Sequence, residues 1–261
     1  MSDLNIFMAF HNNEKTIEKS IKSILQQSYK DFNLILVDDA SSDRSQEIAK
    51  KIKDKDERVN LIINSKQIGL ASSLNNAIKK YPSSFIGRMD ADDFSLPNRI
   101  KYQIRFLKKF KKISVLGTNI YTNYKSKYNI VCLSNKHNEI RKNVYKMMPF
   151  AHPTIIMRIE AFKKVGGYKD LKKSQDLDLF YRMLNKNILF HNLKLPLLIY
   201  KTSNKSVPKI LNSLKIKFLY ELKFKNYLGC ILNIFFSTYE VIKLVLKLII
   251  FPNDKSTSSK Y

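Results

Sequence analysis

Four short apolar segments alternate with amphipathic segments across residues 4–89, and this alternation constrains the fold more than any other feature. Apolar residues three and four apart, such as Ile17, Ile21 and Ile24, predict that the segments between them are helices. Nearly continuous apolar strands with short connections are typical of a parallel sheet covered by helices on both faces. We expect strands at 4–10, 32–37, 59–63 and 84–89, and helices at 14–27, 41–53 (capped by Ser41 or Ser42) and 70–80.

The rhythm changes after residue 93. Pro97 suits the first turn of a helix that runs to about Phe110. Gly166 and Gly167 interrupt the chain before another helix over 174–184, because glycine readily adopts turn conformations. We also expect a helix over 138–146 and short strands at 113–118, 130–133, 188–191 and 197–200.

Carboxylates are concentrated at the ends of two expected strands. Asp90-Ala91-Asp92-Asp93 follows the strand at 84–89, and Asp38-Asp39 follows the strand at 32–37. In an α/β protein these ends share one crevice, where such folds bind ligands. A carboxylate-x-carboxylate pair suits Mg²⁺ or Mn²⁺ bound together with a nucleotide diphosphate. A more ordinary role for Asp93 is to cap the turn before Pro97.

The loop after the first strand argues against two common classes of nucleotide-binding protein. It contains Phe10-His11-Asn12-Asn13 and no glycine-rich segment. A dinucleotide-binding fold or a P-loop NTPase needs glycines there, because the backbone must approach the phosphates closely.

The chain is strongly basic, with 47 Lys and Arg against 22 Asp and Glu, a formal charge of +25. Such an excess indicates an anionic partner: nucleic acid, a phospholipid surface or a phosphorylated ligand. Cys132 and Cys230 fit no metal-ligand spacing and are expected to be free thiols in a reducing cytoplasm. The first residues show no charged-then-apolar signal segment. We therefore expect a cytoplasmic protein.

The segment 228–251 is strongly apolar but is interrupted by Glu240, Lys243 and Lys247. As a helix, it places these charges on one face, and it lacks the run of about 18 uncharged apolar residues that a membrane span requires. It is typical of an amphipathic helix in the membrane interface. The alternative is a helix that packs on the rest of the chain or on a second subunit, which leaves a homodimer possible. The polar tail 254–261 is expected to be disordered.

Five motifs in order resemble glycosyltransferase family 2. The resemblance covers about residues 4–201 and rests on Met8–Glu14, Val37–Asp43, Gly69–Ala71 with Asn75, Arg88–Asp93 and Gln175–Leu179. Each motif is weak alone, and the five together are specific. The resemblance implies inverting enzymes that use nucleotide-diphosphate sugars.

The resemblance also implies an α/β GT-A fold, Rossmann-like, with a mostly parallel sheet flanked by helices. We expect a GT-A domain over 1–207, with a nucleotide-sugar half at 1–95 and an acceptor half at 96–207. An amphipathic helical extension would follow over 208–253.

On the donor side, the resemblance assigns Asp39 to recognition of the nucleotide base, typically uracil, whose imide N–H a carboxylate accepts. It assigns Asp92 as a direct metal ligand, with Asp90 nearer the ribose or a metal-bound water. The donor is expected to be a UDP-sugar and the metal Mn²⁺ or Mg²⁺. The donor-binding residues implied are Ala9, His11, Asn12, Asp39, Arg88 and Asp90.

On the acceptor side, the resemblance assigns Asp176 as the general base that takes the proton of the acceptor hydroxyl. Asp178 is expected to be structural. Gln175 stands where the family often has Glu, and His152 is a second acceptor-side candidate. Many relatives carry a His near the end of this region that completes the metal site, whereas here the run is Tyr200-Lys201-Thr202-Ser203.

The resulting hypothesis is a glycosyltransferase on the inner face of the cell membrane that acts on a lipid-linked, polysaccharide or lipopolysaccharide acceptor. Two alternatives remain open at this point. A nucleotidyltransferase would also pair a sheet with metal-holding acids, but it needs a glycine-rich phosphate loop. A basic nucleic-acid-binding protein fits the charge, but no binding motif is present and the clustered acids would repel phosphates.

Overall fold

The computed structural model describes residues 3–124, 127–144, 147–171 and 174–201. Their nine strands form one sheet in the order β3-β2-β1-β4-β8-β6-β9-β5, with β7 paired to β6. The first half contains β1 (Leu4–Phe10), α1 (Ile17–Leu25), β2 (Asn33–Asp38), α2 (Ser45–Lys53), β3 (Val59–Ile63), α3 (Leu70–Lys80) and β4 (Phe85–Arg88).

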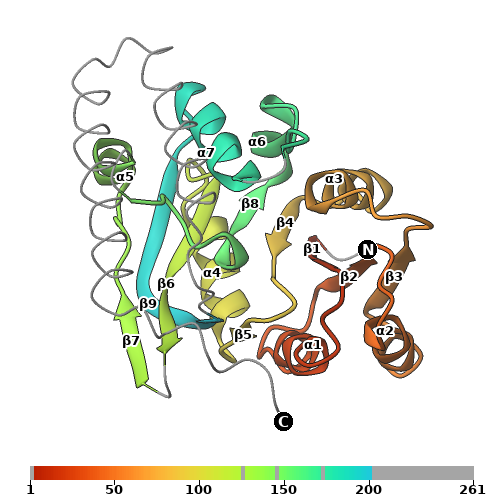
Figure 1. The fold of residues 1–261 in the computed structure, drawn as a ribbon. Helices are drawn as coiled ribbons and strands as arrows, with labels where there is room; N and C mark the ends of the chain where they lie inside the picture. The colour runs from red at the N-terminus through yellow and green to blue at the C-terminus, as the bar shows by residue number, and fades with distance from the viewer. Residues whose placement is uncertain (1–2, 125–126, 145–146, 172–173, 202–261) are drawn as a thin grey trace, which may run out of the picture. The chain divides into compact units, whose positions relative to one another are not determined.

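The first half is the parallel part of the sheet. β1 pairs in parallel with β2 and β4, and β2 pairs in parallel with β3. Helix α3 covers one face, while α1 and α2 cover the other (Figure 1). Alternate β1 residues Leu4, Ile6 and Met8 are buried in the core that also contains Ile17 and Ile21 of α1. The expected alternation of strands and helices is therefore confirmed here.

Two expected helix starts in the first half are wrong. Helix α1 begins at Ile17 rather than residue 14, because the Asn13 carbonyl accepts the amides of Thr16 and Ile17 in a tight preceding turn. Helix α2 begins at Ser45, and neither Ser41 nor Ser42 caps it. The Ser41 amide instead donates to Asp38.

The second half contains shorter and mixed elements. They are β5 (Phe94–Ser95), α4 (Arg99–Lys109), β6 (Val115–Tyr124), β7 (Lys127–Val131), α5 (His137–Asn143), the 3-10 turn η1 (His152–Thr154), β8 (Ile156–Arg158), α6 (Ile159–Lys164), α7 (Gln175–Asn185) and β9 (Phe190–Lys201). β8 is antiparallel to both β4 and β6, so it joins the two halves into one α/β sheet.

Strand β9 is one long element, and the expectation of two short strands is wrong. Its register with β6 shifts on either side of Asn119, the residue that faces Pro196. Proline has no amide hydrogen and is tolerated in a sheet at such a bulge. Asn119 donates to the Lys194 carbonyl at 2.8 Å, which satisfies part of the interrupted ladder. Past the bulge, β9 continues to β5 and reaches the carboxylates that follow β4.

No described helix combines the length and apolarity that crossing a bilayer requires. The extension expected over 208–253, its helix at 228–251 and the tail 254–261 lie outside the described residues, and so does Ser203.

Candidate active site

In the loop after β2, the Asp39 carboxylate accepts several hydrogen bonds from other parts of the chain. Asp39 is buried, and its Oδ1 accepts from Asn64 Nδ2 (2.9 Å), the Ile68 amide (2.9 Å) and Ser73 Oγ (3.1 Å). Its Oδ2 accepts from the Gly69 amide (2.8 Å). Burial alone would raise the pKa of Asp39, but these donors outweigh burial and lower the pKa below its usual value. The carboxylate is therefore ionised and firmly placed.

The loop after β1 lies against this loop. His11 donates from Nδ1 to the Asp39 carbonyl at 2.9 Å. Asn12 adopts a left-handed conformation (φ 54°), and its Oδ1 accepts the Ser42 amide at 2.8 Å. Ala9 lies on β1 beside Val37 of β2. The structure thus brings together four predicted donor-binding residues, Ala9, His11, Asn12 and Asp39.

The loop after β4 is anchored from both sides. The Ser20 hydroxyl of α1 donates to the carbonyls of Asp90 (2.9 Å) and Asp93 (2.5 Å). From the other side, the Lys201 amide at the end of β9 donates to Asp93 Oδ1 at 2.8 Å. The backbone of this acid-bearing loop is therefore held, while the exposed Asp92 carboxylate lies on its outer side.

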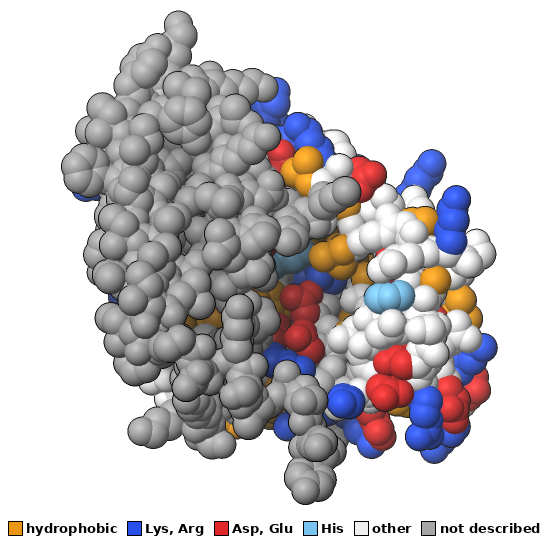
Figure 2. Space-filling model, viewed as in Figure 1, with side chains coloured by type: hydrophobic (Ala, Val, Ile, Leu, Met, Phe, Trp, Pro, Cys, Tyr) orange, Lys and Arg blue, Asp and Glu red, His pale blue; other side chains and the backbone are white. Residues whose placement is uncertain are grey.

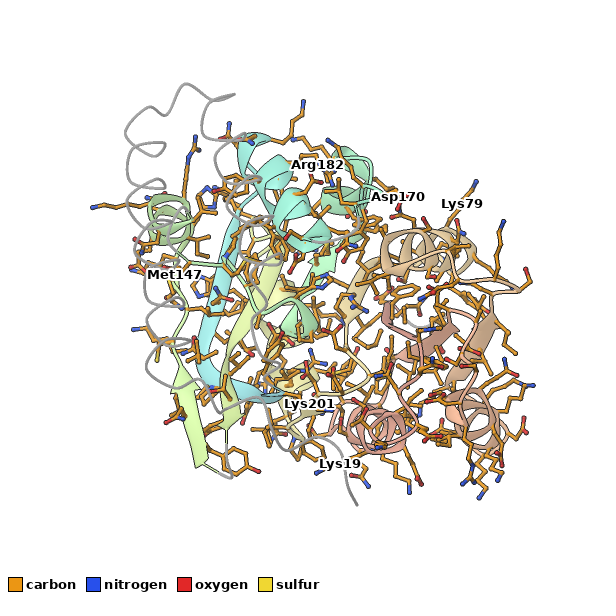
Figure 3. All side chains as sticks on the ribbon, viewed as in Figure 1. Lys19, Lys79, Met147, Asp170, Arg182 and Lys201 are labelled. Atoms are coloured by element: carbon orange, nitrogen blue, oxygen red, sulfur yellow. The ribbon has the colours of Figure 1, made fainter. Side chains whose placement is uncertain are left out.

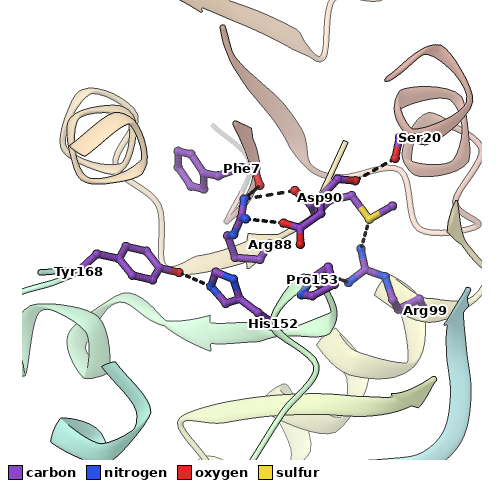
Figure 4. A network of polar contacts seen from close by, with 9 residues as sticks. Phe7, Ser20, Arg88, Asp90, Arg99, His152, Pro153 and Tyr168 are labelled. Carbon is purple, nitrogen blue, oxygen red and sulfur yellow. Dashed lines mark hydrogen bonds and ion pairs between the residues drawn. The ribbon is translucent and has the colours of Figure 1, made fainter. Parts of the chain in front are cut away.

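Arg88 forms an ion pair with Asp90 beneath this loop (Figure 4). Its Nη2 lies 2.5 Å from Asp90 Oδ1, and its Nη1 donates to the Phe7 and Met89 carbonyls. The Arg88 side chain is 4% exposed, whereas that of Asp90 is 33% exposed. The guanidinium thus neutralises part of the acid cluster from below and leaves Asp90 accessible.

Asp93 carries more charge than its surroundings compensate. It is 4% exposed, and Oδ2 has no hydrogen-bond partner among the described residues. Burial and the neighbouring Asp90 and Asp92 raise its pKa to about 8, against the opposing effect of the buried Arg99. A cation at this loop would relieve that repulsion, so the donor set fits a divalent metal. Within the described ranges, however, no three His, Cys, Asp or Glu side chains converge as a complete metal cage.

Asp176 approaches the same place from α7. It lies in the first turn, where its Oδ1 accepts the Leu177 amide at 2.8 Å. The pKa of the Tyr200 phenol is raised, first by burial. Four carboxylates add to the rise: Asp90, Asp93, Asp92 and Asp176. The loop that carries Asp90, Asp92 and Asp93 (the acid loop) and Asp176 therefore both lie within electrostatic range of this phenol.

The polar side chains of Gln175 and Asp178, on either side of Asp176 in the sequence, bind other parts of the chain. Gln175 Nε2 donates to the Leu171 carbonyl at 2.5 Å. Asp178 is buried and pairs with Arg182 at 2.7 Å, as expected for a structural carboxylate. Arg182, which Figure 3 labels on α7, also donates to the Val165 and Gly167 carbonyls.

His152, the other acceptor-side candidate, lies in η1 and contacts Tyr168. Its Nε2 is 2.8 Å from the Tyr168 hydroxyl, and burial together with Arg88 lowers the pKa of the imidazole well below its usual value. The phenols of Tyr168 and Tyr200 were not identified as site residues from sequence. Their only sequence signal is position: one follows the glycine pair, and the other begins the run that lacks the family's His.

Acidic side chains gather near the centre of the face shown in Figure 2, with basic and hydrophobic side chains beside them. Chemically, the carboxylates after β4 could hold a cation together with a diphosphate, and Asp176 could offer a carboxylate base in the same region.

A family model described as glycosyl transferase family 2 matches residues 5–166. EpsE of Bacillus subtilis is 34% identical over 197 residues, which is 73% of this chain and 70% of EpsE. WbnJ of Escherichia coli, an O-antigen biosynthesis glycosyltransferase, is 36% identical over 211 residues, which is 79% of this chain and 82% of WbnJ.

Two solved structures show the same fold at low identity. TarS 1–349 of S. aureus in complex with UDP-GlcNAc has a TM-score of 0.68 at 16% identity, covering 84% of this chain and 66% of that one. The mannosyltransferase PcManGT of Pyrobaculum calidifontis, in complex with GDP-Man and Mn²⁺, has a TM-score of 0.65 at 14% identity, covering 86% and 64%. The chain thus spans less than two thirds of these structures. Its sheet is that of a GT-A enzyme, and the chain belongs to glycosyl transferase family 2.

Proposed function

We propose that this glycosyltransferase moves a sugar, with inversion, from a UDP-sugar to a hydroxyl of a lipid-linked, polysaccharide or lipopolysaccharide acceptor. The observation that carries the proposal is that the acid loop and Asp176, which come from distant parts of the sequence, both lie within electrostatic range of Tyr200. The similarity to WbnJ supports a polysaccharide acceptor. WfgD of Escherichia coli, 35% identical over 106 residues, is a UDP-Glc:alpha-D-GlcNAc-diphosphoundecaprenol beta-1,3-glucosyltransferase, which supports both the donor class and a lipid-linked acceptor.

The nucleotide would lie over the loops after β1 and β2. Among the residues that the structure describes, Asp39 Oδ2 accepts one hydrogen bond, from the Gly69 amide, so it retains acceptor capacity for the imide N–H of uracil. Ala9, His11 and Asn12 would line the same side. The tight anchoring of Asp39 keeps its carboxylate ionised and oriented before the nucleotide arrives, which lowers the ordering cost of binding.

The diphosphate would lie at the loop after β4. Asp92 would hold Mn²⁺ or Mg²⁺, with Asp90 close to the ribose or a metal-bound water. When bound, the cation would offset the negative charge that develops on the leaving diphosphate. Because the described carboxylates form no complete cage, phosphate oxygens and water would have to complete the coordination. The ion pair of Arg88 with Asp90 keeps part of this acidic region neutral between turnovers.

Asp176 would act as the general base. It lies in the first turn of α7, and its Oδ1 accepts the Leu177 amide. It would accept the proton of the acceptor hydroxyl as that oxygen attacks the anomeric carbon from the face opposite the diphosphate. One carboxylate is sufficient, since this route has no covalent intermediate.

The basic composition supports a position on the anionic inner surface of the cell membrane, with the extension 208–253 as the contact. Removal of 208–261 should abolish sedimentation with anionic liposomes at low salt. Continued sedimentation of the shortened chain would place the contact elsewhere, and a dimer that dissociates on removal would favour the packing role.

Asp176→Asn tests the assignment of the base. We expect turnover with a UDP-sugar and a diphosphate-linked lipid acceptor to fall roughly 10²- to 10⁴-fold, while binding of UDP is unchanged. Release of UDP measures the rate, and NMR of the product's anomeric centre measures inversion. Wild-type turnover in this variant, or retention of configuration, would contradict the proposed mechanism.

A further inference from the structure

Tyr168 is held in place by two parts of the chain that are distant in sequence. The Asn75 side chain of α3 donates to the Tyr168 carbonyl (2.8 Å) and accepts the Tyr168 amide (3.0 Å). The preceding Gly166 and Gly167 both have positive φ, 74° and 71°, which sharply turns the chain. The Tyr168 ring is 5% exposed and packs edge-on against Phe162. The position of its hydroxyl is therefore determined by the fold.

The hydrogen bond between Tyr168 and His152 has a defined direction. Among the described residues, the only hydrogen-bond partner of the Tyr168 hydroxyl is His152 Nε2, at 2.8 Å. Burial raises the pKa of this phenol; Arg88 opposes the rise, and Asp176 and Asp90 add to it. The hydroxyl therefore keeps its hydrogen, and a buried O–H without another acceptor donates to the one available. Nε2 is thus the accepting nitrogen.

The other ring nitrogen must then carry the proton. Burial and Arg88 disfavour the charged imidazolium, so His152 is neutral and has one N–H. If Nε2 accepts, that N–H is on Nδ1. In the described ranges Nδ1 has no hydrogen-bond partner, and it is not among the buried polar atoms that lack one. His152 is half-buried and lies between Tyr168 and the Arg88–Asp90 pair (Figure 4), so Nδ1 is open to a ligand at the site.

We propose that Tyr168 is a positioning residue that holds His152 as the neutral Nδ1–H tautomer, so that the ring offers one hydrogen-bond donor to a hydroxyl oxygen of the sugar or of the acceptor. The part that concerns substrates rests on the proposed function; the part that concerns the tautomer does not. A neutral donor suits a hydroxyl oxygen beside Asp176, because it would not stabilise the base's negative charge as a cation would and so would leave its basicity intact.

Long-range ¹H–¹⁵N NMR of the histidine rings in the full chain tests the tautomer without any substrate. We expect His152 to show a protonated Nδ1 and an unprotonated Nε2. Tyr168→Phe keeps the packed ring and removes the donor, so the signals should move to a mixture of tautomers. Tyr200→Phe is the matched control, since Tyr200 faces the same carboxylates, and it should leave the His152 signals unchanged. A protonated Nε2 in the wild type, or no response to Tyr168→Phe, overturns the proposal.

Two substitutions of His152 test which nitrogen works. Asn places an amide N–H near the position of Nδ1, and Gln places one near Nε2. We expect His152→Asn to retain most of the transfer rate and His152→Gln to lose about 3- to 10-fold, the usual effect of one hydrogen bond to a neutral group. The KM that rises in His152→Gln, donor or acceptor, identifies the hydroxyl that is bound. A faster Gln variant overturns the proposal. If no UDP-sugar is turned over by the wild type, the proposed function fails, whereas the NMR result still decides the role of Tyr168.

Discussion

Acids cluster where β2 and β4 end, yet the fold treats the acids of the two loops in opposite ways. In the β2 loop, Asp39 accepts four hydrogen bonds from the chain and its pKa is lowered. In the β4 loop, Asp93 accepts one hydrogen bond from the Lys201 amide, has an oxygen without a partner among the described residues, and has its pKa raised to about 8.

The difference separates a preformed surface from a site that needs a ligand. A buried carboxylate that is fully hydrogen-bonded stabilises the fold and gives a ligand a rigid contact. A buried carboxylate that faces two others without enough donors costs stability unless a cation or a proton joins it. We infer that the β2 loop orients the base of the nucleotide. We infer that the β4 loop binds a cation together with the diphosphate.

Among the substitutions in the two loops, Asp92→Asn should have the largest effect, and that effect is on kcat/KM. A bound metal contributes several kcal/mol of transition-state stabilisation, so kcat/KM should fall on the order of 10²- to 10³-fold. Asp54→Asn is the matched control, because Asp54 is an exposed carboxylate at the end of α2. If Asp92→Asn keeps wild-type kcat/KM in Mn²⁺, the metal assignment is wrong.

Asp39→Asn should destabilise the fold. Either orientation of the new amide turns an N–H toward a donor that the carboxylate now accepts, Gly69 on one side or Ile68 on the other. We expect a loss of about 1–3 kcal/mol in the free energy of unfolding, measured by urea denaturation at pH 7.5. An unchanged midpoint would mean that these four hydrogen bonds are not what holds the loop.

Asp93→Asn should raise the free energy of unfolding, the opposite of the effect expected for Asp39→Asn. At pH 7.5 burial, Asp90 and Asp92 make the folded chain bind a proton at Asp93 that the unfolded chain has released. Asparagine removes that cost, and its amide oxygen can still accept the Lys201 amide. Without metal at pH 7.5 we expect a gain of about 1–2 kcal/mol in the free energy of unfolding. Adding Mg²⁺ and UDP should favour the wild type instead. A loss of stability in the metal-free variant would refute the contrast between the loops.

The pH dependence of stability should show the effect of the same group. The folded pKa of Asp93, about 8, lies above its ordinary value of 3.8. Between these values the folded chain binds a proton that the unfolded chain has released. The group's contribution is therefore present below about pH 4, and the free energy of unfolding falls as pH rises toward 8. Urea denaturation at pH 5 and pH 7.5 should show a steeper fall for the wild type than for Asp93→Asn. Equal slopes would contradict the raised pKa.

Local periodicity was sufficient for much of the first half. The strands at 4–10 and 59–63 and the helix at 70–80 have the predicted bounds. The helix buries one regular apolar face, and the strand at 4–10 is buried on both faces, as expected for a covered parallel sheet. The second half depends on distant pairing. β5 and β8 contain two and three residues and exist because β9 and β4 lie beside them. Because proline disfavours a strand interior, Pro196 led to the prediction of two short strands in place of β9. The bulge that accommodates the proline is not visible in the sequence.

The sequence motifs selected the candidate residues of the site, and their roles stay predictions. Asp90, Asp92 and Asp176 were selected in this way, and all three lie within electrostatic range of Tyr200. The motifs do not show which hydrogen-bond donors each carboxylate receives. Asp39 and Asp93 look alike in sequence, and they differ because residues 64–73 return to the first whereas one backbone amide of β9 reaches the second. The contact of Tyr168 with His152 also depends on tertiary structure.

The most direct test of the central claim is calorimetric titration of the full chain with UDP in Mg²⁺, in Mn²⁺ and in EDTA, with GDP and CMP as comparisons. If the β4 loop binds the diphosphate through a cation, UDP should bind with either metal and lose most of its affinity in EDTA, and Asp92→Asn should behave in Mn²⁺ as the wild type does in EDTA. If UDP binds equally well in EDTA, or if Asp92→Asn retains full affinity in Mn²⁺, the β4 loop is not a cation–diphosphate site and the account is wrong.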